Sequence, residues 1–220
     1  KGNGKVESNS VGGVTSDPFV VYISGSDTRS QILDTSRSDV NILMVVNPNS
    51  HQILMINTPR DYYVANPAGN GAMDKLTHCG LYGIDCSMQA LAQLYDVEVN
   101  YSAQINFTGF ETLVDAVGGI TINLDSGFST DEGYYFSAGE NSLDGVHALA
   151  FARDRHHQYD GDNGRGRNQM KVLSAIISKM TSGSTIVSRY SDILGSLEGM
   201  FVTSLSSDEI NSFARMQIDD

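Results

Sequence analysis

The sequence predicts an α/β fold: a single domain with a central, mostly antiparallel or mixed β-sheet flanked by α-helices. Two observations predict it. Short continuous apolar runs are typical of strands buried on both faces, and longer segments with apolar residues at helical spacing are typical of amphipathic helices. A length of 220 residues suits one domain, and an apolar content of 40% is that of a globular chain.

The first three apolar runs predict three neighbouring antiparallel strands, at residues 18–23, 42–46 and 53–56. The second and third runs are separated by residues 47–50, whose Asn-Pro-Asn-Ser sequence is a turn signal, so we expect a hairpin there. The first and second runs are joined by residues 24–38, which are polar and lack a helical pattern. These two strands are therefore expected to pair antiparallel as well.

The rest of the chain alternates helical and strand patterns. Thr108 and Glu111 have the spacing of a capping box, and so do Ser206 and Glu209, so each pair predicts a helix start. The remaining elements are expected, in order, as a helix over 87–95, a strand over 101–107, a helix over 108–117, a strand over 120–124, and helical segments over 143–152, 165–181, 184–200 and 207–216.

Composition along the chain sets the expected domain boundaries. Residues 1–16 are rich in Ser, Gly and Asn, which predicts a flexible linker or tail. Residues 17–182 form the expected domain, and residues 183–220 a C-terminal helical extension without an assigned role. The sequence has no run of 18 apolar residues, the length typical of a membrane-spanning helix.

Charge and cysteine content bear on partners and compartment. A net charge of -12 argues against nucleic-acid binding, because duplex recognition depends on a basic surface. Cys79 and Cys86 are the two cysteines, and the glycines between them allow the segment to loop. A disulfide between them, which implies an oxidising compartment, is favoured over two unlinked thiols.

The antiparallel topology brings one set of charged residues to a single end of the sheet. Asp27 follows the first strand, Asp39 precedes the second, and Arg60 follows the third. Two carboxylates at a strand edge can hold Mg²⁺ together with waters and substrate phosphates, and the alternative is that each aspartate pairs with a nearby arginine. The residues expected at this edge are Asp27, Arg29, Arg37, Asp39, Arg60 and Asp61.

A second charged cluster indicates phosphate binding. Four of the nine arginines lie within residues 153–167. Arg165 and Gln169 are four residues apart and share a helix face, and we expect them in a first turn, where free N–H groups and the helix dipole favour an anion. The planar fork of arginine matches phosphate geometry, and the alternative is a solvated, salt-bridged surface turn. Lys75 could add a further phosphate contact.

A set of short stretches occurs in a fixed order along the chain: residues 26–29, 36–39, 58–61, 74–78, 106–110, 114–120, 151–155 and 162–165, followed by Gln169. Taken in order, these stretches resemble the LytR–CpsA–Psr family of Gram-positive cell-envelope proteins. Before the last helix of the matched region that family frequently has Arg-Gln, whereas here Asn168 precedes Gln169 and Arg167 lies one place earlier. The departure concerns one accessory contact and not the core set.

The resemblance implies an extracytoplasmic enzyme held by an N-terminal membrane helix. Such enzymes move an anionic glycopolymer, such as teichoic acid or capsular polysaccharide, from undecaprenyl pyrophosphate onto peptidoglycan. The resemblance implies Mg²⁺ on Asp27 and Asp39 and a hydrophobic tunnel for the lipid; a pyrophosphatase side activity is also expected. The expected pyrophosphate contacts are Arg37, Arg60, Lys75, Arg153, Arg155, Arg165 and Gln169, and the expected catalytic residues are Arg60, Asp162 and Arg165.

Three alternatives stay open. Asp162 is the candidate general base, but it could instead orient Arg165. The domain could be a binding module that holds polyprenyl pyrophosphate without chemistry. It could also be a transcriptional attenuator, although the net charge of -12 and the missing helix-turn-helix argue against that role.

Overall fold

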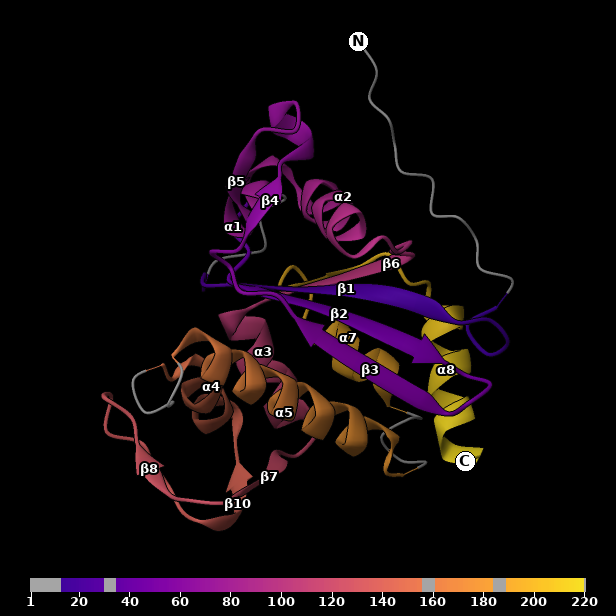
Figure 1. Cartoon of the computed structure of the whole chain (residues 1–220). Coiled ribbons are helices and arrows are strands. Elements are labelled where there is room, and N and C mark those ends of the chain that lie inside the picture. The colour runs from indigo at the N-terminus through magenta and orange to yellow at the C-terminus, as the bar shows by residue number, and fades with distance from the viewer. Residues whose placement is uncertain (1–12, 30–34, 156–160, 184–188, 220) are drawn as a thin grey trace.

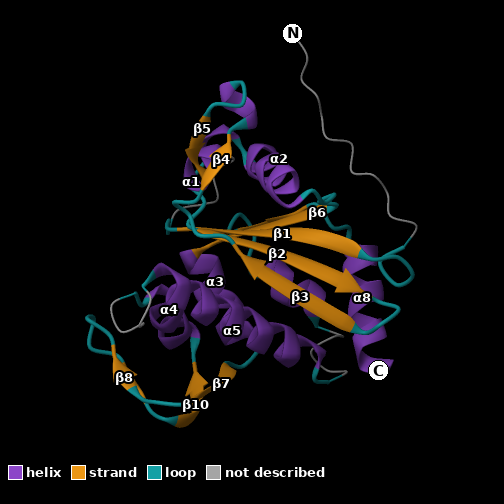
Figure 2. Ribbon diagram, viewed as in Figure 1, coloured by secondary structure: helices purple, strands orange, loops and turns teal. Residues whose placement is uncertain are grey.

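The central sheet contains five strands in the order β11-β6-β1-β2-β3. The computed structural model describes residues 13–29, 35–155, 161–183 and 189–219. Figure 2 shows helices on both faces of the sheet, so the predicted α/β fold is confirmed. The strands are β1 (Phe19–Ser26), β2 (Val40–Asn47), β3 (Gln52–Asn57), β6 (Tyr101–Asn106) and β11 (Phe201–Thr203).

The register of the sheet confirms the predicted antiparallel strands. β1 pairs antiparallel with β2, and β2 pairs antiparallel with β3. β6 lies parallel to β1 on the other side, so the sheet is mixed. Gly25 pairs with Val40, which brings the residues after β1 beside those before β2. The topology therefore places Asp27 and Asp39 at one end of the sheet, as expected.

One face of the sheet is covered by a helical layer and a small hairpin, drawn above the sheet in Figure 1. Tyr22 and Leu43 lie in this core with Leu76 and Leu91, and all four are fully buried or nearly so. The elements of this layer are β4 (Tyr63–Ala65), η1 (Pro67–Gly69), β5 (Met73–Lys75), α1 (Leu76–Cys79), η2 (Gly80–Tyr82) and α2 (Ile84–Tyr95).

A larger helical layer covers the opposite face, drawn below the sheet in Figure 1. Its core includes Val114, Ile122, Phe151 and Val172, which come from three helices and a strand. Among the described helices, none combines the length and apolar composition needed to cross a bilayer. The elements are α3 (Phe107–Ala116), β7 (Ile120–Leu124), β8 (Phe128–Ser129), β9 (Tyr135–Phe136), β10 (Gly139–Leu143), α4 (Gly145–Arg153) and α5 (Asp162–Thr181).

The C-terminal segment completes the sheet. β11 pairs with β6 as an edge strand, between α7 (Tyr190–Gly195) and α8 (Ser207–Asp219). The Ser206–Glu209 capping box is confirmed, because each backbone N–H bonds to the other side chain, at 2.8 and 3.2 Å. Part of the expected C-terminal extension therefore belongs to the central sheet.

Several helix starts differ from the prediction by one to three residues, and those of α3 and α5 also differ in how the helix end is capped. α3 is capped by Asn106, whose side chain accepts a hydrogen bond from Gly109 N at 2.7 Å, so Thr108 is not its N-cap. α5 begins at Asp162, three residues before the predicted start. The amide of Arg165 consequently donates to Gly161 O at 3.0 Å and is not a free first-turn donor. The predicted anion site at that amide is wrong, and the role of Arg165 rests on its guanidinium.

The predicted disulfide is wrong, because both cysteines are free and buried. Cys79 ends α1 and Cys86 lies in α2, where its thiol donates to Asn66 Oδ1 at 3.3 Å. Burial is the main cause that raises the pKa of the Cys79 thiol to about 12, and Cys86 adds to it. The thiols therefore give no support for an oxidising compartment.

Tyr101 ties α8 to the sheet through a hydrogen bond from its hydroxyl to Glu209 Oε1 at 2.7 Å. Burial, followed by this hydrogen bond, raises the pKa of Tyr101 to about 12. An unfolded-state tyrosine ionises near about pH 10, so the stabilisation is complete below that pH and is lost as the pH rises towards the folded pKa.

We expect Tyr101→Phe to reduce the free energy of unfolding by about 1–2 kcal/mol at neutral pH, because it removes this bond. Thermal unfolding between neutral and alkaline pH measures the effect. The wild type should lose its advantage over Tyr101→Phe above about pH 10. An advantage that persists unchanged at the highest pH would contradict this account.

Candidate functional site

A cavity of about 620 Å³ lies between the sheet and the helices α3, α4 and α5. Its apolar walls come from the sheet and from α5. Ile23 pairs in register with Ile42 and with Ala103 on the sheet, and Val172 and Ile176 line the cavity from α5. The polar residues that line the cavity are Asp27, Asp39, Arg60, Asn106, Thr130, Asp131, Glu132, Arg153, Asp154, Arg155, Arg165 and Gln169.

These charged residues come from chain segments that meet at one end of the sheet. Asp27, Asp39 and Arg60 flank the ends of β1, β2 and β3. Arg153 ends α4 and Arg165 lies in the N-terminal part of α5, and Figure 1 shows those helix ends near the same sheet edge. The structure thus brings Arg60 into one cavity with Arg153, Arg155 and Arg165, which lie about a hundred residues later in the sequence.

Asp39 is the centre of the first cluster. Its Oδ1 forms an ion pair with Arg60 Nη1, and its Oδ2 accepts a hydrogen bond from the backbone amide of Asp27 at 3.0 Å. The side chain of Asp27 is exposed and lines the cavity. From the sequence, two roles are open to Asp39, a Mg²⁺ ligand or the partner of an arginine. In this structure it pairs with Arg60.

Arg153 is held in the second cluster by two contacts. Its guanidinium carbon lies 4.9 Å from the centre of the Phe107 ring, and Nη1 lies 3.4 Å from Glu132 Oε1. Glu132 and its neighbour Asp131 lie between β8 and β9, and both line the cavity. The sequence motifs did not predict these two acids, because no pattern links residues 131–132 to the arginines.

Arg165 is 7% exposed and lines the cavity. Its neighbour Gly166 allows α5 to approach β3 closely: a Cβ at this position would lie 2.2 Å from Asn57 Nδ2. Asn168 also joins α5 to α4 through a 3.2 Å hydrogen bond to Phe151 O. These contacts fix the part of α5 from which Arg165 and Gln169 reach the cavity.

Two expected site residues, Arg37 and Lys75, do not line the cavity, and the side chain of a third, Asp162, is outside the described part of the structure. Lys75 Nζ lies 3.0 Å from Asp61 Oδ1, and this pair stands outside the cavity lining. The bond from Lys75, with the charges of Arg60 and Arg155, holds the pKa of Asp61 below its usual range. Arg37 is exposed and does not line the cavity. Asp162 is the first residue of α5, but its side chain lies outside the described part of the structure.

The arrangement suits a ligand with an anionic group at one end and an apolar tail. Arginines offer paired N–H donors to phosphate oxygens, and the apolar walls can cover a hydrocarbon chain. Among the described residues, no group of three or more His, Cys, Asp or Glu side chains could hold a metal ion alone. Asp27 and Asp39 could still contribute to a Mg²⁺ site completed by substrate phosphates and waters.

Comparisons with known proteins agree with this geometry. The model of the LytR_cpsA_psr family matches residues 1–219. Polyisoprenyl-teichoic acid–peptidoglycan teichoic acid transferase TagU from Enterococcus faecalis is 37% identical over 200 residues, which cover 90% of this chain. The chain spans 65% of the length of that relative.

Solved structures share the fold. TagU from B. subtilis superposes with a TM-score of 0.72 at 35% identity, over 90% of this chain and 80% of that one. A structure of TagT bound to LI-WTA has a TM-score of 0.75 at 30% identity, over 96% and 78% of the two chains. The family model matches nearly the whole length of this chain, and the chain therefore belongs to the LytR_cpsA_psr family.

Proposed function

We propose that this chain is the extracytoplasmic domain of a phosphotransferase that attaches a teichoic acid or similar anionic glycopolymer to peptidoglycan. The donor is the polymer on undecaprenyl pyrophosphate. The observation that carries the proposal is one cavity that joins an arginine-lined end to apolar walls. The names of the relatives TagU and TagT, and the ligand LI-WTA, support the substrate class. Attachment to the outer face of a Gram-positive membrane, through a helix N-terminal to residue 1, rests on family membership.

In this proposal the pyrophosphate lies between Arg60 and the arginines near the facing ends of α4 and α5. Arg60 and Arg165 donate to its oxygens from opposite walls, and Arg153, Arg155 and Gln169 surround it. The polyprenyl chain lies along Ile23, Ile42 and Val172, which makes this part of the cavity the hydrophobic tunnel. Arg37 and Lys75 do not line the cavity, so in this proposal they contact only those parts of the substrate that extend beyond it.

The reaction is a displacement at phosphorus. A hydroxyl oxygen of a peptidoglycan sugar attacks the phosphorus that carries the polymer and forms a new P–O bond. The bond to the bridging pyrophosphate oxygen breaks, and polyprenyl phosphate leaves with the electron pair. The arginines offset the charge that develops on the leaving oxygen, and positioning supplies much of the rate enhancement. Water in place of the sugar would give the pyrophosphatase side activity.

The hydroxyl proton must pass to a base or to solvent. Asp162 remains our candidate, because it starts the helix that carries Arg165. Its alternative role is to orient that arginine. The two roles differ in their pH profiles: loss of a general base removes the acidic limb of the kcat profile, whereas loss of an orienting contact lowers kcat at every pH.

Mg²⁺ fits the donor set at the edge of β1 and β2. Asp27 and Asp39 offer carboxylate oxygens, and each oxygen of Asp39 accepts only one hydrogen bond described above, which leaves a lone pair. Bound there, Mg²⁺ would neutralise phosphate charge, and Asp27 and Asp39 would hold it in place.

We expect Asp27→Asn to raise the Mg²⁺ concentration required for half-maximal transfer by about 10–100-fold. Asp27 is the better test because Asp39 also anchors Arg60. Transfer rates measured across a Mg²⁺ titration give the result, with Asp208→Asn on the exposed start of α8 as control. A rate that does not respond to Mg²⁺ or to a chelator contradicts the proposed metal.

Incubation of the protein with lipid-linked polymer, Mg²⁺ and peptidoglycan oligomers tests the function itself. We expect polymer–peptidoglycan conjugate together with at least an equal amount of polyprenyl phosphate, because the side reaction with water also releases polyprenyl phosphate. Tight binding of the donor without turnover would instead identify a binding module. A shift of DNA at low salt, with no effect on the donor, would support the attenuator.

A further inference from the structure

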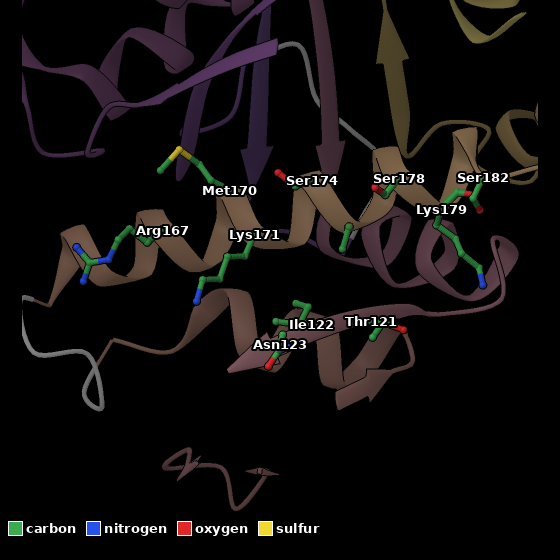
Figure 3. A pocket seen from close by; sticks show the side chains of 11 residues that line it. Thr121, Ile122, Asn123, Arg167, Met170, Lys171, Ser174, Ser178, Lys179 and Ser182 are labelled. Carbon is green, nitrogen blue, oxygen red and sulfur yellow. The ribbon is translucent and has the colours of Figure 1, made fainter. Parts of the chain in front are cut away.

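A second surface hollow, of about 740 Å³, runs along α5 beside β7 (Figure 3). We call it the α5–β7 groove. Its walls are the outer face of α5 from Arg167 to Lys179, Ser182 just after the helix, and Thr121, Ile122 and Asn123 of β7. Arg165, Gln169 and Val172 line the catalytic cavity from another face of the same helix. One helix therefore separates the two hollows.

The groove is basic, although the protein is acidic. Its eleven lining residues include three cations, Arg167, Lys171 and Lys179, and no acid. The whole chain has 26 acidic against 14 basic residues, so this distribution is a strong local reversal. Glu140 lies opposite Asn123 on β10 and does not line the groove.

The two lysines are available to an external anion. Figure 3 shows the side chains of Lys171 and Lys179 extending from α5 towards the side on which β7 lies. Within the described chain, neither lysine takes part in an ion pair. Ser174 and Ser178 lie along the same helix at four-residue spacing and can donate hydroxyl hydrogen bonds.

The cations form a row that suits a repeating anion. The helical rise separates Arg167 from Lys171 by about 6 Å and Lys171 from Lys179 by about 12 Å along the axis. A polyol-phosphate chain carries a negative charge at every repeat and can meet several of these cations at once. Because its charges recur at every repeat along one chain, the polymer can meet this row of cations better than the peptidoglycan acceptor can.

The groove also begins next to the catalytic cavity. Arg167, at its N-terminal end, is two residues from Arg165 in the cavity. A polymer whose pyrophosphate end lies at Arg165 can pass the start of α5 and continue along the outer face of the helix.

We propose that the α5–β7 groove binds the polyol-phosphate chain of the donor. This inference rests on the proposed function, because it extends the donor site from the pyrophosphate to the polymer. The groove would make the enzyme select donors that carry a charged polymer over donors that carry only the first sugars.

The test compares two doubly substituted proteins with the same change in net charge. Lys171→Glu/Lys179→Glu reverses the groove, and Arg189→Glu/Arg215→Glu reverses two exposed cations that do not line it. The first readout is calorimetric binding of lipid-free poly(glycerol phosphate) at low salt. We expect Kd to rise about tenfold in the groove variant and by less than about twofold in the control.

The second readout is the ratio of KM for a long-polymer donor to KM for a donor with only the linkage sugars. We expect this ratio to rise about tenfold in the groove variant. Equal losses in both double variants, or no change in either, would overturn the inference. A rise in KM for the peptidoglycan acceptor, with polymer binding unchanged, would also overturn it and assign the groove to the acceptor.

These outcomes are distinct from a failure of the proposed function. If the wild type transfers neither donor, the transferase assignment fails, whereas binding of the lipid-free polymer still tests the groove by itself. Thermal unfolding of each variant confirms that it is folded.

Discussion

Replacement of Arg165 by alanine is expected to reduce kcat for polymer transfer by about 10²–10³-fold, the cost of removing one preorganised donor to developing negative charge. Arg165 is nearly buried, and it lines the cavity on a helix held against β3 at Gly166 and against α4 at Asn168. Because the contacts at Gly166 and Asn168 do not involve the Arg165 side chain, we expect only a small change in the free energy of unfolding. Initial rates with a lipid-linked donor, with thermal unfolding in parallel, measure both effects.

Two further variants make this prediction specific. Arg165→Lys keeps the charge but loses the planar fork, so it should recover only part of the lost rate. Arg215→Ala removes an exposed arginine from α8 and should transfer at the wild-type rate. Arg60→Ala should also reduce turnover steeply, although it releases Asp39 as well. If the Arg60 and Arg165 variants both transfer polymer at the wild-type rate, the site assignment is wrong.

The second large effect is expected from Ala103→Phe, which obstructs the apolar part of the cavity. Ala103 lies on β6, beside Ile23 in register, and both residues line the cavity. Exclusion of about four methylene groups of the lipid removes about 3 kcal/mol of burial, or roughly 100-fold in apparent affinity for the donor. A donor with a short prenyl chain should be much less affected.

The control for this prediction is Val202→Phe. Val202 is exposed on β11, and its register partner on β6 is Gln104, so the added ring lies outside the cavity lining. KM values for long- and short-chain donors are compared in both proteins and the wild type. Equal KM changes for the two donors in the Ala103 variant would show that the lipid does not occupy this part of the cavity.

The positions of several site residues could be predicted from the order of the strands. Continuous apolar runs gave β1, β2 and β3 as antiparallel neighbours, and from that topology alone Asp27, Asp39 and Arg60 were expected at one edge. Arg153 and Arg165 could be expected to line the same cavity, because they lie on either side of the single connection between α4 and α5. These arguments succeed because buried strands and helix ends leave local patterns in the sequence.

The parts that escaped prediction depend on tertiary contacts. β11 is a three-residue edge strand and β10 is largely polar, so neither has a strong local pattern. Glu132 lies in a turn and contacts Arg153, and no sequence pattern links these two residues. The Cys86 thiol donates a hydrogen bond to Asn66, a tertiary contact that the spacing of the two cysteines could not reveal.

The central claim is that one cavity holds a polyprenyl pyrophosphate, with its phosphates at the arginines and its lipid on the apolar walls. A crystal structure of the protein with a non-hydrolysable polyprenyl pyrophosphate and Mg²⁺ tests it most directly. The account predicts phosphate oxygens within hydrogen-bond distance of Arg60 and Arg165, Mg²⁺ at Asp27 and Asp39, and lipid density beside Ile42 and Val172. Phosphate density at any other place on the protein, with this cavity empty, would contradict it.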